Sequence, residues 1–275
     1  MTFGSRLRDA MDARGPLCAG IDPHPALLDA WGMTDSAVGL ERFSMIAVEA
    51  LAGASAAIKP QSAFFERHGS KGVAVLEKVI AEARNLGSIV VLDVKRGDIG
   101  STAQAYADAY LDRSSPLAAD AITASPFLGF GSLDPIIDTA LANDAGVFVL
   151  ALTSNPEGPQ VQHARTEDGR TVAGTVLESI AARNRGESPL GSIGAVVGAT
   201  IGETTEDLDV NGPLLVPGLG AQGGTLDDVR RIFGAATRNV LASSSREILS
   251  AGPDKAALHH AALETARQLA ALSAP

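Results

Sequence analysis

The chain has 275 residues, of which 45% are hydrophobic and 20% are charged, and its formal net charge is −10. This length suits one or two domains, and some barrel folds reach about 250 residues as a single domain. The acidic balance argues against a nucleic acid or a polyanionic membrane as partner, because both are bound through basic patches. The single cysteine, Cys18, excludes an intramolecular disulfide and a cysteine-cluster metal site.

The N-terminal segment and the hydropathy of the chain predict where the protein resides. Residues 1–9 carry charges at positions where a secretion signal would be apolar. No apolar run approaches the roughly 18–20 residues that a membrane span requires. We therefore expect a globular, cytoplasmic protein.

Short apolar runs recur along the chain and predict β-strands. Several runs are almost continuously apolar, which is typical of parallel strands covered on both faces. In chain order the predicted strands are residues 17–22, 56–61, 89–95, 121–125, 146–154, 193–200, 213–217 and 239–244.

Amphipathic stretches with apolar residues at helical spacing lie between these runs. They predict helices at residues 5–13, 38–52, 73–86, 101–110, 133–141, 172–183, 226–233 and 256–272. Ser101 and Gln104 resemble a capping box that opens one of them. A strand-then-helix unit repeated about eight times predicts a (β/α)₈ TIM barrel, a single domain over residues 1–275. A doubly wound open sheet is the alternative.

One connection, residues 155–170, is unusually long. It is rich in Pro, Gly, Gln and charge, and it has no helical period. Loops longer than about 12–15 residues are more often functional lids or disordered segments than plain connectors. We therefore expect a long loop after the fifth strand.

Polar residues stand at the ends of several predicted strands, where barrel enzymes place their active sites. The chain has only five lysines, and two of them, Lys59 and Lys95, end apolar runs. Charged lysines at such positions require partners. The set comprises Asp22, Lys59, Asp93, Lys95, Ser154, Gln222 and Arg246.

The segment around the third strand supplies such partners. Asp93 and Lys95 are two residues apart on a strand, so their side chains point to the same face, and Asp98 follows in the next turn. With Lys59 from the second strand they can form an alternating Lys–Asp–Lys–Asp row, which would keep its members ionised and fix a cationic proton donor. The alternative is an ion-pair network that only closes the barrel mouth.

A glycine-rich turn follows the seventh strand. Gly218, Gly220 and Gly223 formally match the dinucleotide fingerprint, but no acidic residue ends a following strand to hold a ribose. Backbone amides in such a turn form a general anion cradle, and Arg246 adds a cation after the eighth strand. Since barrels frequently bind phosphate between these two loops, we predict a phosphate site. Ordinary tight turns with a solvated arginine are the alternative.

The five histidines predict no metal centre. They are His24, His68, His163, His259 and His260, and their spacing forms no ligand set.

Taken together, these motifs resemble the orotidine 5′-phosphate decarboxylase family, in its bacterial subgroup with longer chains. The segment D-x-K-x-x-D-I also occurs in relatives that decarboxylate a keto-sugar phosphate, but its combination with K-P-Q and P-G-x-G-A-Q-G-G is more specific. Residues 155–170 depart from the shorter members of the family. The matching segments are residues 20–23, 58–61, 93–99, 152–154, 217–224 and 245–246.

The resemblance implies conversion of orotidine 5′-monophosphate to uridine 5′-monophosphate and carbon dioxide, without a metal or an organic cofactor. It implies that Lys95 donates a proton to C6 of the pyrimidine and that Asp93 lies beside the substrate carboxylate, with Lys59 and Asp98 completing the row. In this family the segment that matches Asp98, Ile99 and Thr102 enters the neighbouring subunit's site. The resemblance therefore implies a homodimer.

The same resemblance implies the remaining contacts with the nucleotide. Asp22 matches a residue near the ribose hydroxyls, and Ser154 matches one that bonds the amide edge of the pyrimidine. Gln222 would bridge base and phosphate, and Arg246 would clamp the phosphate. The predicted substrate-binding set is completed by Pro217, Gly223 and Ser245.

Three other functions fit parts of the pattern. A keto-sugar phosphate decarboxylase of the same superfamily would require a divalent metal. A Schiff-base aldolase would need Lys59 or Lys95 partly neutral, which nearby aspartates disfavour. A non-catalytic nucleotide-binding barrel would have no need of the charged row.

Overall fold

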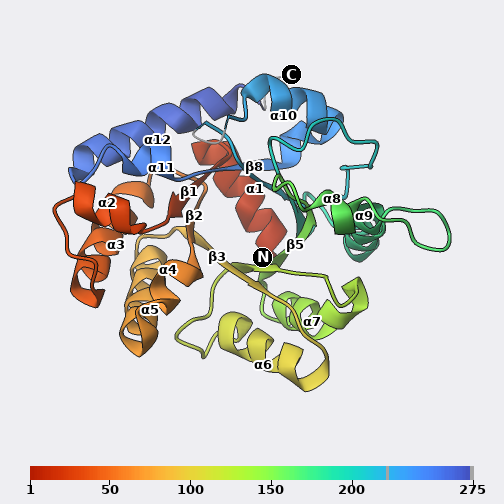
Figure 1. The fold of residues 1–275 in the computed structure, drawn as a ribbon, viewed down its shortest axis with the longest axis horizontal. Helices are drawn as coiled ribbons and strands as arrows, with labels where there is room; N and C mark the ends of the chain where they lie inside the picture. The colour runs from red at the N-terminus through yellow and green to blue at the C-terminus, as the bar shows by residue number, and fades with distance from the viewer. Residues whose placement is uncertain (221–222, 273–275) are drawn as a thin grey trace.

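Eight parallel strands close into a barrel in the order β1 to β8 (Figure 1). The computed structural model describes residues 1–220 and 223–272. β8 pairs with β1, with Ala242 opposite Leu17, and this pairing closes the sheet. The predicted barrel is confirmed and the open-sheet alternative is wrong. The strands are β1 (Leu17–Ile21), β2 (Ala57–Pro60), β3 (Ile89–Arg96), β4 (Ala121–Ala124), β5 (Gly146–Leu152), β6 (Ile193–Val197), β7 (Leu214–Pro217) and β8 (Val240–Ser244).

Helices form a ring around this barrel (Figure 1). Within residues 1–220 and 223–272 each predicted helix is present, with bounds shifted by a few residues, and four short helices are additional. The long ones are α1 (Phe3–Arg14), α3 (Ala37–Leu51), α5 (Gly69–Asn85), α6 (Gly100–Leu111), α7 (Asp134–Ala142), α9 (Val172–Arg183), α10 (Leu226–Phe233) and α12 (Lys255–Ala270). The additional ones are α2 (Pro25–Ala30), α4 (Ser62–Glu66), α8 (Pro159–Gln162) and α11 (Arg246–Leu249), and the 3₁₀ turns are η1 (Phe130–Leu133) and η2 (Gly234–Asn239).

The alternation of strand and helix is interrupted once. Residues 198–213, which join β6 to β7, contain no helix. Asn211 has a left-handed backbone at φ 48° and precedes Gly212 and Pro213. These residue types are unfavourable within a helix, so the end of this connection, before β7, is irregular.

The predicted capping box at Ser101 and Gln104 is wrong. α6 begins at Gly100, and its N-cap residue Ile99 has an extended backbone and makes no side-chain cap. Ser101 therefore lies inside the first turn, and Gln104 instead donates a hydrogen bond of 2.7 Å to Asp108. The carboxylate of Asp98 accepts a 2.8 Å hydrogen bond from the Ile99 N–H, which keeps the chain extended up to the helix start.

Two apolar layers hold the barrel together. The larger lies between the strands and the surrounding helices, and the smaller fills the barrel interior and contacts α1. Phe3 and Leu7 of α1 are fully buried in the inner layer, and the Phe3 ring meets Phe148 edge-on with centroids 6.1 Å apart. α1 thus closes the end of the barrel where the strands begin, and the opposite end remains open.

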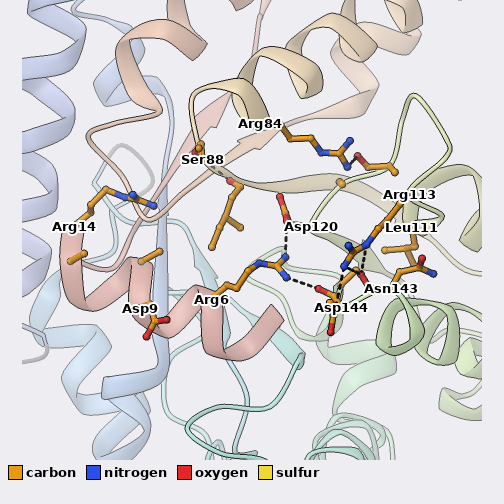
Figure 2. A pocket seen from close by; sticks show the side chains of 17 residues that line it. Arg6, Asp9, Arg14, Arg84, Ser88, Leu111, Arg113, Asp120, Asn143 and Asp144 are labelled. Atoms are coloured by element: carbon orange, nitrogen blue, oxygen red, sulfur yellow. Dashed lines mark hydrogen bonds and ion pairs between the residues drawn. The ribbon is translucent and has the colours of Figure 1, made fainter. Parts of the chain in front are cut away.

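A cavity of about 650 Å³ lies beside α1 at this closed end (Figure 2). Its arginines are already engaged by the protein. Arg6 donates to the Asp120 carboxylate at 2.7 Å and to the Asp144 carbonyl at 2.9 Å, and Arg14 donates to the Ser55 carbonyl at 2.7 Å. Arg84 and Arg113 likewise donate to the carbonyl oxygens of Ala118 and Asn143. These hydrogen bonds connect loops to the beginnings of strands and thereby stabilise the fold.

The long connection after β5 is present, but it is not uniformly irregular. Pro159–Gln162 form the single helical turn α8, which the sequence pattern did not predict. The segment then extends outward beside α9 (Figure 1). In the described part of the chain, no helix has both the length and the hydropathy to cross a membrane.

Candidate active site

A cavity of about 550 Å³ opens at the end of the barrel where the strands finish. Of the predicted site residues, Gln222 lies outside the described residues. Asp98, Ile99, Thr102 and Gly223 do not line this cavity. Those that do are Asp22, Lys59, Asp93, Lys95, Ser154, Pro217, Ser245 and Arg246.

The inner faces of β2, β3 and β4 change from apolar to polar along their length. Ala57, Val91 and Ala121 belong to the apolar layer inside the barrel. Two residues further on, and therefore on the same face, stand Lys59, Asp93 and Thr123. These polar side chains meet above the apolar layer, where Lys59 Nζ and Thr123 Oγ1 both donate to the Asp93 carboxylate.

Asp93 is the centre of this polar cluster. Its Oδ2 accepts a hydrogen bond from Lys59 Nζ at 3.2 Å, and its Oδ1 accepts from Lys95 Nζ at 2.6 Å. Thr123 Oγ1 also donates to Oδ1, at 2.8 Å. With its nitrogen turned toward Asp93, the Gln61 amide donates to Oδ2 at 3.2 Å. One carboxylate thus lies between two ammonium groups.

The charges in this cluster stabilise one another against burial. Burial by itself would raise the pKa of Asp93, but the charges of Lys59 and Lys95 and the hydrogen bonds outweigh it and lower this pKa to about 2. Burial would lower the pKa of Lys59, yet Asp93 and Asp22 raise it above its usual value. Asp93 and Lys59 are therefore both ionised at neutral pH.

Lys95 has an unusual backbone. Its φ is 46°, in the left-handed region that non-glycine residues rarely adopt. The pairing of β3 with β4 shifts register between Leu92 and Arg96, and the Lys95 N–H donates to Thr123 Oγ1 at 2.9 Å. The Lys95 side chain is 47% exposed, so its ammonium contacts Asp93 while facing the cavity.

The fourth member of the predicted row does not join it within one chain. The Asp98 carboxylate bonds the N–H of Ile99, at the start of α6. Ile99 is 61% exposed, and Thr102 is exposed on the same helix. The structure therefore brings together Lys59, Asp93 and Lys95, and it leaves Asp98 outside their cavity.

The loops after β7 and β8 form the other side of the cavity. Gly218 has φ 101° and Gly220 has φ 65°, and the Gly224 N–H donates to the Gly218 carbonyl at 3.0 Å, which folds the turn back on itself. Arg246 begins α11. Among the described residues, its guanidinium forms no ion pair. An arginine with no internal partner beside such a turn is typical of an anion site.

Two buried oxygen atoms in this cavity have no hydrogen-bond partner in the described part of the chain. They are Asp22 Oδ1 and Ser245 Oγ. Buried polar atoms are nearly always paired in native proteins, so an unpaired one in a cavity indicates a group that a ligand would satisfy.

The loop after β5 is anchored close to Ser154. The Gln162 side chain in α8 accepts a 2.9 Å hydrogen bond from the Thr153 N–H and donates one of 2.7 Å to Thr153 Oγ1. Gln61, Thr123 and Gln162 were not predicted as site residues. The K-P-Q motif and the two-residue alternation of β4 could have indicated the first two, whereas no sequence signal indicates Gln162.

The fold and this mouth define a class: a (β/α)₈ barrel enzyme with a Lys–Asp–Lys cluster in the cavity at the ends of its strands. Residues 15–261 match the model of the orotidine 5′-phosphate decarboxylase / HUMPS family, and the chain belongs to this family.

Similar proteins share this assignment. An orotidine 5′-phosphate decarboxylase of Nocardioides sp. is 65% identical over 250 residues, covering 90% of this chain and 91% of that one. An orotidine 5′-phosphate decarboxylase of Streptomyces coelicolor is 60% identical, with 94% of each chain covered. The crystal structure of a proposed orotidine 5′-phosphate decarboxylase from Streptomyces avermitilis is 59% identical, covers 100% of this chain and 96% of that one, and has a TM-score of 0.97.

Proposed function

We propose that the protein is an orotidine 5′-phosphate decarboxylase, a carbon–carbon lyase that forms uridine 5′-monophosphate and carbon dioxide in pyrimidine biosynthesis. The observation that carries the proposal is the Lys95 ammonium, held 2.6 Å from the Asp93 carboxylate in the open mouth of a barrel of this family. We take residues 1–275 as one catalytic domain, and we place it in the cytoplasm.

The chemistry requires a cation at the carbon that loses its carboxyl group. The bond between C6 and the carboxyl carbon breaks, carbon dioxide leaves, and the electron pair stays on C6 in an orbital that the ring carbonyls cannot delocalise. An ammonium at this position stabilises the carbanion as it forms. Lys95 Nζ then transfers its proton to C6, and water restores the proton to the lysine.

The neighbours of Lys95 hold the proposed proton donor in position. Asp93 contacts both ammonium groups and would lie beside the substrate carboxylate. Lys59 is buried at the far side of Asp93, where its charge balances the carboxylate. This proton transfer needs no metal or organic cofactor, so we propose that the enzyme uses neither.

The remaining contacts would bind the nucleotide through groups distant from C6. Arg246, with the turn from Pro217 to Gly223 and Ser245, would hold the phosphate. Asp22, whose buried Oδ1 has no partner among the described residues, would accept from the ribose hydroxyls. Ser154 and Gln222 would contact the base. Binding energy from the phosphate can thereby be used to hold the reacting carbon against Lys95.

We propose a homodimer in which Asp98, Ile99 and Thr102 of each chain complete the site of its partner. Within one chain Asp98 lies outside the cavity, as described above. Ile99 and, on the adjacent loop after β4, Phe127 and Leu128 are 61%, 76% and 54% exposed. Clustered exposed apolar side chains are typical of a surface that another chain covers.

The test is to follow the ultraviolet absorbance of orotidine 5′-monophosphate during incubation with the enzyme, with and without a chelator. We expect equal turnover in both conditions. Turnover that disappears in chelator would instead support a keto-sugar phosphate type of metal-dependent chemistry. Binding of the nucleotide without any turnover would support a non-catalytic barrel.

A further inference from the structure

We propose that Thr123 is a positioning residue for the proton transfer, because its hydroxyl locks the backbone of Lys95 and the carboxylate of Asp93 into one arrangement. This inference rests on the proposed function, since positioning Lys95 matters to turnover only if Lys95 is the proton donor.

The geometry places one hydroxyl between both groups. Thr123 lies on β4 and is 1% exposed. Its Oγ1 accepts from the Lys95 N–H at 2.9 Å and donates to Asp93 Oδ1 at 2.8 Å. The same carboxylate oxygen accepts from Lys95 Nζ at 2.6 Å. The three residues therefore form a closed ring of hydrogen bonds that starts and ends at Lys95.

The backbone of Lys95 explains why such a lock is needed. A left-handed conformation at a non-glycine residue costs free energy and persists only where surrounding contacts impose it. Lys95 lies within the register shift between Leu92 and Arg96, and its N–H donates to the Thr123 hydroxyl and not to a backbone carbonyl of β4. The Thr123 hydroxyl accepts the hydrogen bond that a backbone carbonyl of β4 would accept in a regular ladder. It thereby fixes the backbone position from which the Lys95 side chain extends.

The direction of each bond in the ring is also determined. A backbone N–H can only donate, and an ionised carboxylate can only accept. The single hydrogen of Thr123 must therefore point to Asp93, while its lone pair faces Lys95. Because threonine is β-branched, its side chain has few rotamers and holds this orientation with little freedom. No other hydroxyl of the described residues contacts both groups.

The test compares Thr123→Val with Thr123→Ser in the intact enzyme. Valine keeps the branched shape and removes the hydroxyl, whereas serine keeps the hydroxyl. We expect Thr123→Val to lower kcat by about 10- to 100-fold, because small displacements of a catalytic group have effects of this size. KM and the Kd of uridine 5′-monophosphate should change less than about threefold, since Thr123 is remote from the phosphate contacts. Thr123→Ser should restore turnover to within about fivefold of wild type.

A matched control separates positioning from packing. Thr237 is also buried, donates to the Gly234 carbonyl at 2.7 Å and lies outside the cavity. Thr237→Val should leave kcat unchanged even if it lowers Tm. In the Lys95→Ala background, Thr123→Val should lower the residual turnover much less than it does in wild type, because the residue it positions is absent. A purely structural role would lower turnover by the same factor in both backgrounds.

Several results would overturn the inference. These are a kcat of Thr123→Val within twofold of wild type, equal effects with and without Lys95, or no rescue by serine. If the valine variant does not fold, Thr123→Ala supplies the same comparison. A wild-type enzyme without turnover would refute the proposed function itself, which distinguishes that failure from a failure of the role of Thr123.

Discussion

The two mouths of the barrel contain cavities of similar size and similar polarity, yet they differ in what their charged groups contact. At the mouth beside α1 the arginines donate to backbone carbonyls and to Asp120. At the opposite mouth Lys59 and Lys95 pair with the Asp93 carboxylate, and the Arg246 guanidinium forms no ion pair with the described residues. Asp22 Oδ1 and Ser245 Oγ have no partner in the described residues, and Lys95 faces the cavity.

This difference teaches that cavity volume and charge do not by themselves identify a site. The cavity beside α1 is the larger, at about 650 Å³ against about 550 Å³. Its arginines already donate to carbonyl and carboxylate oxygens of the fold, so an anionic ligand would have to displace those bonds. A functional mouth keeps polar atoms whose partners the substrate would supply.

The largest expected effect is at Lys95. Lys95→Ala should lower turnover by at least about a thousandfold, because it would remove both the charge that we propose stabilises the carbanion and the proton that we propose is transferred to it. Its half-exposed side chain is not part of the core, so circular dichroism should show an intact fold. Lys71→Ala, at another exposed lysine, is the control and should turn over normally. Near-normal turnover of Lys95→Ala would refute the donor role.

The second effect concerns stability and its pH dependence. Asp93→Asn leaves the Lys59 ammonium buried without its partner and should cost about 3 kcal/mol at pH 7. The pKa of Asp93 is lowered to about 2, below the value of about 4 in an unfolded chain. Its stabilising contribution is therefore present above about pH 4 and is lost as the pH falls toward 2.

Urea unfolding of wild type and Asp93→Asn at pH 7, 4 and 3 measures this contribution. The difference between the urea midpoints of wild type and Asp93→Asn should decrease as the pH falls, because a protonated Asp93 in the wild type is uncharged like asparagine. Asp29→Asn, at an exposed aspartate, should show no such difference. A difference that stays constant down to pH 3 would contradict the assigned charge state.

The third effect concerns the proposed phosphate-binding side of the same mouth. Arg246→Ala should weaken binding of uridine 5′-monophosphate by about 10- to 100-fold, because a charge-assisted contact with phosphate is lost. Lys95→Ala should weaken it less. Calorimetric titration distinguishes the two, with Arg185→Ala as the surface control. Equal losses of nucleotide affinity in all three variants would contradict the proposal that Arg246 binds the phosphate and Lys95 acts on the base.

The smallest effect is expected at the mouth beside α1. Arg6→Ala should lower the free energy of unfolding by about 1–2 kcal/mol, because the partly buried Asp120 carboxylate loses its cationic partner and keeps only the Val90 N–H. Turnover should stay within about twofold of wild type. If a folded Arg6→Ala enzyme has strongly reduced turnover, the mouth beside α1 contributes to function, and the proposed difference between the two mouths is wrong.

Much of the architecture could be predicted, and the errors have local causes. Alternating apolar runs and amphipathic stretches indicated each strand and each long helix. The capping box at Ser101 failed because the N-cap of α6 is Ile99, two residues before Ser101, and the extended backbone of Ile99 depends on Asp98. α8 was missed because a single turn has no periodicity to detect. Thr123 was missed because its role depends on a register shift in the neighbouring strand.

The order of residues along the chain determined that Asp93 and Lys95 share a face, that glycines and Arg246 follow the last strands, and that the strands are parallel. These features are local, since they depend on spacing and on residue type. Closure of the barrel decided that Lys59 and Thr123 contact the same carboxylate, and that α1 closes one mouth and leaves the other open. Asp98 stands outside that cavity for the same reason: contacts between distant segments are set by packing, which no single stretch of sequence contains.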